Sequence, residues 1–226
     1  MKVVLSIFLI LFFVPDLCAS SPLSVAFGPG IRKNVKSMQD VSRENMVPQT
    51  LDYSCGPASL ATIMTYYFGD EVTEGQAIYT LLKTSDFAKV KMRNGFSLLD
   101  LKNYSLGRGY DVVGYRMDFQ FLVDLNTPVL LPVNIRDYGH FIVFRGYRHG
   151  RVYVSDPVLG NLTMKKDEFL RLWEGGVGLV LAKEGFDSPG PLAIGEKEDI
   201  RFLFPSSLNA RFGIGTIGKI VHRGEF

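Results

Sequence analysis

The chain has 226 residues, of which 46% are hydrophobic and 21% are charged, so one domain with a sizeable buried core is expected. Its 25 basic and 23 acidic residues leave a net charge of +2, without long runs of one sign. This balance argues against nucleic acid or an acidic membrane surface as a partner, because both attract concentrated positive charge.

The first twenty residues have the pattern of a secretory signal peptide. Lys2 is followed by an apolar run from Val3 to Val14, and we place cleavage near Ser20, with Ala26 as the alternative. The run is shorter than a membrane-spanning helix needs, although an uncleaved anchor is a second interpretation. Residues 1–20 therefore predict an exported protein, in the periplasm or alternatively outside the cell.

Export changes the meaning of the two cysteines, Cys18 and Cys55. Removal of a signal peptide leaves Cys55 alone, in a compartment where cysteines normally pair. A lone cysteine there indicates an intermolecular disulfide or a reactive thiol. An inert buried cysteine is the third alternative.

The chain after the signal peptide begins with an arm and continues into a helical segment. Residues 21–43 are rich in turn-forming and polar types and predict an arm without a core of its own. Apolar residues crowd between Ala58 and Phe68, and Pro57 suits the first turn of a helix that starts directly after Cys55-Gly56. The next predicted elements are a helix over 74–83, a helix from the capping box Ser97–Asp100 to Gly107 or Gly109, a strand over 110–115 and a helix over 119–125.

The second half has the alternating pattern of strands. The elements predicted there are strands over 128–135, 140–147, 151–156 and 178–182, and a short helix over 167–174. Pro132 argues for an edge strand or an irregularity. Arg148-His149-Gly150 suits a three-residue hairpin loop with the glycine in the left-handed position. Helices followed by an antiparallel sheet predict an α+β domain over residues 44–184. Residues 185–226 show no periodicity and form a tail without an assigned role.

Cys55 lies at a predicted helix start, where unsatisfied N–H groups favour a thiolate. The chain has three histidines that could act as its base. His149 falls in the predicted turn, and His222 lies in the tail without an evident partner. His140 begins an apolar strand, where a lone histidine is more often structural than functional.

The predicted hairpin register supports a functional role for His140. With a three-residue loop, Tyr147 pairs with Arg151, and His140 and Asp156 become diagonal neighbours on one face, with Cα atoms about 7–8 Å apart. A two-residue loop would place them on opposite faces. The predicted loop thus provides a carboxylate that can orient the imidazole, although Asp156 alone fits equally well as a turn residue.

Gln49 lies six residues before Cys55, and its amide is a candidate oxyanion donor beside the Cys55 backbone N–H. A single glutamine at this spacing carries little weight without the other residues. No metal site is indicated, because cysteines and histidines do not recur at ligand spacing. Gly107-Arg-Gly109 lacks the Lys-Ser/Thr ending of a phosphate loop, so we expect no ATP and no cofactor.

Taken together, these residues resemble the C39 peptidases, which are papain-like cysteine peptidases. The matching pieces, in the family's order across about residues 44–184, are Gln49, Cys55-Gly56-Pro57-Ala58, His140-Phe-Ile-Val-Phe, Val152-Tyr-Val-Ser-Asp156-Pro157 and Gly160. The resemblance implies a papain-like fold with N-terminal helices packed on an antiparallel sheet. It also implies a triad of Cys55, His140 and Asp156, with Gln49 as the oxyanion residue.

The best-known C39 peptidases are cytoplasmic domains of bacteriocin exporters and cleave leader peptides after a double glycine. The predicted signal peptide places this chain on the other side of the membrane, so the sequence leaves open whether the double-glycine preference is kept. Stand-alone exported relatives occur with surface-protein and functional-amyloid secretion systems. We therefore expect a cysteine peptidase acting on an exported protein or peptide, with a secretion-system component as a candidate partner. A non-catalytic peptide-binding module and another papain-like reaction on a non-protein substrate are the alternatives, and the oligomeric state is left open.

Overall fold

A computed structural model describes residues 37–186 together with Leu192 and Ile194. All of them lie in one compact unit that begins at Lys36. The predicted signal peptide, most of the predicted arm and most of the predicted tail lie outside the described residues. Within the part of the chain that is described, no helix is both long enough and apolar enough to cross a membrane.

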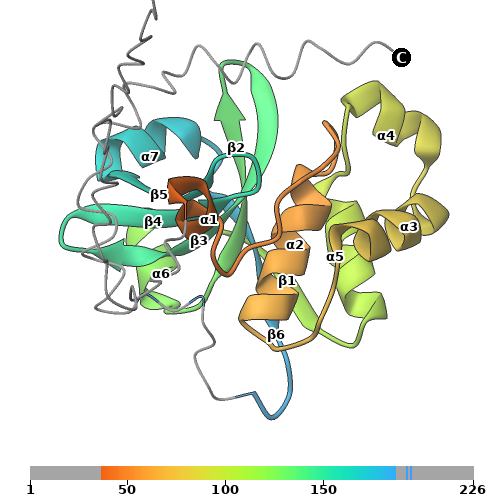
Figure 1. The fold of residues 1–226 in the computed structure, drawn as a ribbon, viewed down its shortest axis with the longest axis horizontal. Coiled ribbons are helices and arrows are strands. Elements are labelled where there is room, and N and C mark those ends of the chain that lie inside the picture. Colours follow the sequence, from red (N-terminus) through yellow and green to blue (C-terminus); the bar gives the residue numbers. More distant parts are fainter. Residues whose placement is uncertain (1–36, 187–191, 193, 195–226) are drawn as a thin grey trace, which may run out of the picture. The chain divides into compact units, whose positions relative to one another are not determined.

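A buried helix, α2 (Cys55–Tyr66), is the centre of the helical part of the domain (Figure 1). Every residue from Cys55 to Met64 is buried, which explains the crowding of apolar residues in this stretch of sequence. The other helices of this part are α3 (Glu74–Thr84), α4 (Phe87–Arg93) and α5 (Leu98–Gly107), whereas the short helix α1 (Met38–Ser42) lies beside β5. The sequence predicts α2, α3 and α5 but neither α1 nor α4.

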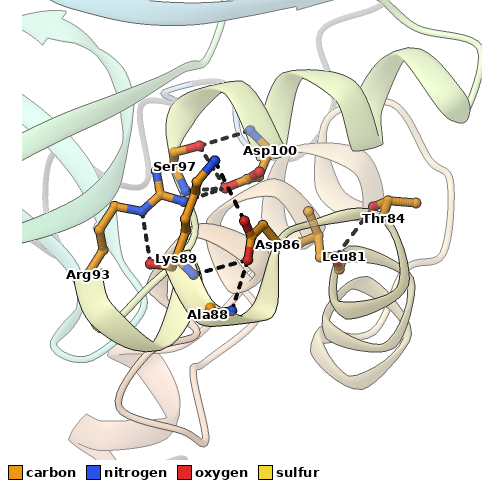
Figure 2. Close-up of polar contacts among 8 residues, drawn as sticks. All are labelled: Leu81, Thr84, Asp86, Ala88, Lys89, Arg93, Ser97 and Asp100. Atoms are coloured by element: carbon orange, nitrogen blue, oxygen red, sulfur yellow. Dashed lines mark hydrogen bonds and ion pairs between the residues drawn. The ribbon is translucent and has the colours of Figure 1, made fainter.

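Side-chain caps determine where α4 and α5 begin (Figure 2). Asp86 accepts hydrogen bonds from two backbone N–H groups in the first turn of α4. The capping box predicted at Ser97 and Asp100 is present at the start of α5. Arg93 links the two helices, because its guanidinium contacts Asp100 Oδ2 at 3.4 Å and donates to the carbonyl of Lys89.

Six antiparallel strands form one sheet in the order β1-β6-β2-β3-β4-β5. Their bounds are β1 (Asp111–Arg116), β2 (Val129–Ile135), β3 (Tyr138–Arg148), β4 (Arg151–Asp156), β5 (Gly160–Lys165) and β6 (Val177–Ala182). β5 is the strand that the sequence does not predict. Two helices, α6 (Phe119–Asp124) and α7 (Lys166–Leu172), interrupt the strands.

Helices cover both faces of this sheet. Leu130 packs in one apolar cluster with residues of α2, α3 and α5. Its neighbours Val129 and Leu131 pack in a second cluster with residues of α6 and α7. This alternation along β2 follows from the two-residue period of a strand, and it accounts for the nearly continuous apolar run in the sequence.

Pro132 lies in the part of β2 that pairs with only one other strand, β3. β2 is interior in the strand order, but its pairing with β6 covers only Val129 and Leu130. Pro132 lies beyond that pairing and is opposite Phe141 of β3. A proline, which has no N–H to donate, is tolerated at such a locally unpaired position.

The turn between β3 and β4 differs from the prediction. Arg148 pairs with Arg151, so the loop consists of two residues, His149 and Gly150, and the predicted three-residue loop is wrong. Both loop residues have positive φ angles, 49° and 76°, as a type I′ turn requires. If the two strands paired regularly from this two-residue loop onward, His140 and Asp156 would lie on opposite faces of the sheet.

A β-bulge compensates for the shorter loop. Tyr147 pairs with Val152, whereas Phe144 pairs with Val154, so β3 contains one extra residue between them. Gly146 in the bulge has a φ of 152°, a conformation that favours glycine. Beyond the bulge Val143 is opposite Ser155, which is the register that the sequence predicts for this end of the hairpin.

Candidate active site

Cys55 is the first residue of α2 and is a free thiol with only 6% of its surface exposed. Its backbone N–H is among those that a helix start leaves without an intrahelical acceptor. The glycine that follows allows close packing at this point. A Cβ atom on Gly56 would lie 2.9 Å from Leu101 Cδ1 and 3.2 Å from Phe141 Cδ2. The start of α2 is therefore held closely between α5 and β3.

His140 lies near the beginning of β3 and is only 6% exposed. Its Nε2 atom is 3.2 Å from Asp156 Oδ1. Since Nε2 faces the carboxylate, Nδ1 is the ring nitrogen left for Cys55, whose side chain is near enough to help raise the pKa of His140. The predicted triad residues thus form one connected group.

The electrostatics of this group favour a charged imidazole. Burial alone lowers the pKa of His140, but the Asp156 carboxylate, its hydrogen bond and the Cys55 side chain outweigh burial and raise this pKa to about 10. Burial likewise opposes ionisation of Asp156. The charge and hydrogen bond of His140, with two backbone N–H groups, nevertheless lower the pKa of Asp156. An imidazolium is therefore held between a carboxylate and a thiol.

Asp156 is also a turn residue. Its Oδ1 atom accepts hydrogen bonds from the N–H groups of Val158 (2.8 Å) and Leu159 (3.1 Å). These bonds close the connection from β4 to β5 and fix the carboxylate. The sequence left open whether Asp156 is a turn residue or the partner of His140. In the structure Asp156 is both.

Gln49 is attached to the same turn. Its backbone N–H donates to the carbonyl of Pro157 at 3.0 Å, and its Nε2 donates to the carbonyl of Leu51 at 3.1 Å. Reversing the amide would place Oε1 against the Leu51 carbonyl, so the assigned orientation is favoured. Within the described residues Oε1 is buried without a hydrogen-bond partner, and one Nε2 hydrogen is not used by the Leu51 contact.

Gln49, His140 and Asp156 line a single cavity of about 280 Å³. The other residues lining it are Arg43, Thr50, Leu51, Asp52, Ile135, Tyr138, Val158 and Leu159. Cys55 is not among the residues that line the cavity, but its side chain influences the pKa of His140, which does line it. The remaining described histidine, His149, lies in the hairpin turn, and His222 lies outside the described residues.

Tyr138 is a site residue that the sequence does not reveal. Its hydroxyl donates to the carbonyl of Asp52 at 3.1 Å, across the cavity from the β3 strand to the loop before Cys55. Burial raises the pKa of Tyr138, and the charges of Cys55 and Asp52 raise it further. The phenol thus lies near the thiol.

No group of three or more His, Cys, Asp or Glu side chains among the described residues could hold a metal ion. The site brings together the imidazole of His140 and the carboxylate of Asp156, with the Cys55 side chain nearby. This set of groups suits nucleophilic attack on a carbonyl carbon with transfer of a proton.

Comparison with known proteins relates this geometry to one family. The peptidase C39 family matches residues 43–185. A Pseudomonas fluorescens protein named "Probable functional amyloid protease FapD" is 38% identical over 165 residues, which are 73% of this chain and 72% of that protein.

Two solved structures are similar to the domain. The peptidase domain of Streptococcus ComA, a bi-functional ABC transporter involved in quorum sensing, has a TM-score of 0.52 and 23% identity over 62% of this chain and 98% of that one. A double glycine motif protease from an AMS/PCAT transporter, in complex with the leader peptide, has a TM-score of 0.51 and 26% identity over 60% and 89%. These similarities confirm the predicted papain-like α+β fold.

Proposed function

The chain belongs to the peptidase C39 family, and from this premise we propose that it hydrolyses a peptide bond in an exported protein or peptide. It is a cysteine peptidase by family. In the proposal Cys55 is the nucleophile, His140 is the base and acid, and Asp156 orients His140. Gln49 contributes a donor to the oxyanion hole. The observation that carries the proposal is the 3.2 Å contact of His140 Nε2 with Asp156 Oδ1, on a ring whose pKa the Cys55 side chain helps to raise.

In the first half of the reaction the Cys55 thiolate attacks the carbonyl carbon of the substrate. A C–S bond forms, and the π electrons of the carbonyl move to its oxygen. The Cys55 backbone N–H and the second Nε2 hydrogen of Gln49 stabilise this oxyanion, and one such donor typically contributes about 10²–10³-fold to kcat. The C–N bond then breaks, and the leaving amine takes the proton of His140.

In the second half a water molecule hydrolyses the thioester. His140, now neutral, accepts a proton from the water while the water oxygen attacks the acyl carbon. The C–S bond breaks, the carboxylic acid product leaves, and the thiolate and imidazolium are restored. Asp156 keeps the ring in one tautomer and orientation throughout, because Nε2–H points at its carboxylate.

We infer further that the substrate belongs to a secretion or surface-fibre system, with functional amyloid as the leading case. The similarity to a protein named as a functional amyloid protease supports this assignment. The predicted signal peptide over residues 1–20 supports action after export. We place the peptidase domain over residues 44–184, and the family match over 43–185 supports this assignment.

The proposal is tested by comparing the purified protein with its Cys55→Ala variant on a mixed peptide library, with products read by mass spectrometry. We expect the substitution to reduce turnover on the order of 10⁴-fold or more, with retained binding of trapped substrate. Iodoacetamide at neutral pH should alkylate Cys55 faster than free cysteine. Alkylation no faster than that of free cysteine would contradict an activated thiolate, and full biological output from Cys55→Ala would indicate a binding module instead.

A further inference from the structure

A buried carboxylate lies behind the site and takes no part in the proposed reaction. Glu74 is the first residue of α3, yet only 7% of its surface is exposed. A buried carboxylate is costly unless hydrogen bonds compensate for the lost water. Thr50 donates two hydrogen bonds to Glu74: its N–H lies 2.7 Å from Oε1, and its hydroxyl lies 2.5 Å from Oε2. The hydroxyl of Ser54 also lies 2.5 Å from Oε1.

The partners of Glu74 mark the two ends of one loop. Thr50 directly follows Gln49, and Ser54 directly precedes Cys55. The carboxylate therefore holds both ends of the segment that joins the proposed oxyanion donor to the proposed nucleophile.

Short polar contacts connect Glu74 with the loop that carries the Gln49 amide. Ser54 is the N-cap residue of α2, but its side chain makes no capping bond to the helix. Its hydroxyl instead lies 2.5 Å from Glu74 Oε1 and 2.6 Å from the carbonyl of Leu51, and its single hydrogen can be donated to either acceptor. The same carbonyl accepts the Nε2–H of Gln49 at 3.1 Å and the Ser54 N–H at 3.1 Å. The orientation of the Gln49 amide thus depends on the Leu51 carbonyl, which lies in a loop that Glu74 holds directly through Thr50.

The start of α3 is itself well fixed. Thr73 and Gln76 form a capping box, with contacts of 3.0 and 3.2 Å between each side chain and the other's backbone N–H. Ala77 and Leu81 of the same helix are fully buried in the cluster that contains α2. Glu74 therefore extends from a rigid element into a loop that has little regular structure of its own.

We propose that Glu74 is a positioning residue of the oxyanion hole. It holds the Thr50–Ser54 loop so that the Gln49 amide and the Cys55 N–H point at the same oxygen. This role rests on the proposed function and adds a residue from a neighbouring helix to the site. Glu74 acts through Gln49 and touches neither the substrate nor the thiol.

The first test compares oxyanion binding with thiolate reactivity in Glu74→Gln, which keeps the size of the side chain. N-acetylglycinal is the probe, because Cys55 adds to its aldehyde and the resulting oxygen occupies the oxyanion hole. Alkylation by iodoacetamide forms no oxyanion and reports the thiolate alone. We expect Glu74→Gln to weaken N-acetylglycinal about 10-fold and to lower kcat with little change in KM, while the alkylation rate stays within about twofold.

Glu71→Gln is the matched control, because Glu71 is an exposed carboxylate shortly before α3, and it should leave both readouts unchanged. If Glu74→Gln does not fold, Thr50→Val removes one of the donors to Glu74 and keeps the backbone N–H. It should then weaken the aldehyde several-fold.

A double-mutant cycle decides whether Glu74 acts through Gln49. In a Gln49→Ala background, Glu74→Gln should weaken the aldehyde by less than about twofold, since the group that it positions is gone. A full 10-fold effect in that background, a parallel loss of alkylation, or no effect of Glu74→Gln in the wild type would overturn the proposal. The proposed function fails separately, if the wild type binds the aldehyde but cleaves no peptide in the library.

Discussion

At the scale of single residues, the site is marked by ionisable side chains that are buried. Within the described residues His140, Asp156 and Glu74 are all buried, and each either belongs to the site or supports the loop before Cys55. Their residue types alone predict exposure, because charged side chains are rarely buried unless they are paired. The sequence therefore identifies His140 and Asp156 as candidates through motif and register, and it does not identify Glu74.

If His140 acts as proposed, its raised pKa predicts an alkaline limit for the activity. The imidazolium is present below its pKa of about 10 and is lost as pH rises through that value. In the unfolded chain this pKa is near 6.5, so the stabilisation from the charged ring is complete below about pH 6.5. As pH rises from about 6.5 to about 10, this contribution of the charged ring to the free energy of unfolding is lost.

Asp156→Asn should move the alkaline limb of kcat/KM to lower pH. The substitution removes the charge that favours the imidazolium and leaves burial, which opposes it, so we expect a shift of about 1–3 pH units. The pH profile of peptide hydrolysis measures it. Asp86→Asn, at the exposed cap of α4, is the control and should leave the limb in place. An unshifted limb in Asp156→Asn would show that another group sets the alkaline limit.

At the scale of elements, the hairpin of β3 and β4 decides whether the site forms. Its two-residue turn sets one register, and the bulge at Gly146 changes it by one residue before His140 is reached. Bulges commonly redirect side chains beside functional sites. In this hairpin the bulge brings His140 and Asp156 to the same face of the sheet.

Gly146→Ala should therefore lower both stability and activity. At a φ of 152° an added Cβ would lie 2.6 Å from Ile194 Cδ1, and we expect a loss of about 1–3 kcal/mol in the free energy of unfolding. Urea denaturation measures this loss. Gly114→Ala in β1 is the control, because a Cβ there meets no atom within 4 Å, and it should change stability by about 0.5 kcal/mol or less. Equal effects of the two substitutions would mean that the bulge tolerates a side chain.

At the scale of the whole molecule, distant segments of the chain meet at one buried guanidinium. Arg145, next to the bulge, donates from Nε to the carbonyl of Leu192 at 3.0 Å and from a terminal nitrogen to Asn161 Oδ1 at 3.1 Å. Asn161 in turn donates to the carbonyl of Glu44 at 2.7 Å. These bonds join β3, β5, the segment before α2 and Leu192, so part of the predicted tail belongs to the folded domain.

Leu192→Ala should test the contribution of this segment to stability. Leu192 has 0% of its surface exposed, and truncation of a fully buried leucine typically costs about 2–5 kcal/mol. The midpoint of chemical denaturation should fall accordingly. Leu106→Ala on α5, where the leucine is 46% exposed, is the matched control and should cost about 1 kcal/mol or less. A similar small loss in both variants would show that the Leu192 segment adds little to the fold.

Elements with strong local signals could be predicted from the sequence by itself. The apolar density of α2, the capping box at Ser97 and the alternation in β4 are properties of a few neighbouring residues, and local interactions are enough to produce them. α1 buries no residue and α4 buries only Val90, so neither shows an apolar face, and β5 begins with Gly160-Asn161, residue types that are uncommon in strands. The order of Gln49, Cys55, His140 and Asp156 likewise came from the sequence, through its resemblance to a family.

Only the tertiary structure decided how these residues meet. Arg148-His149-Gly150 fits a two-residue or a three-residue loop equally well, and the choice depends on the bulge at Gly146. The burial of Glu74 against Thr50, 24 positions earlier, depends on how α3 packs on α2. The physical reason is that turn and cap preferences act within a few residues. Register and burial instead follow from the packing of the whole core, where side chains from every part of the domain compete for the same interior.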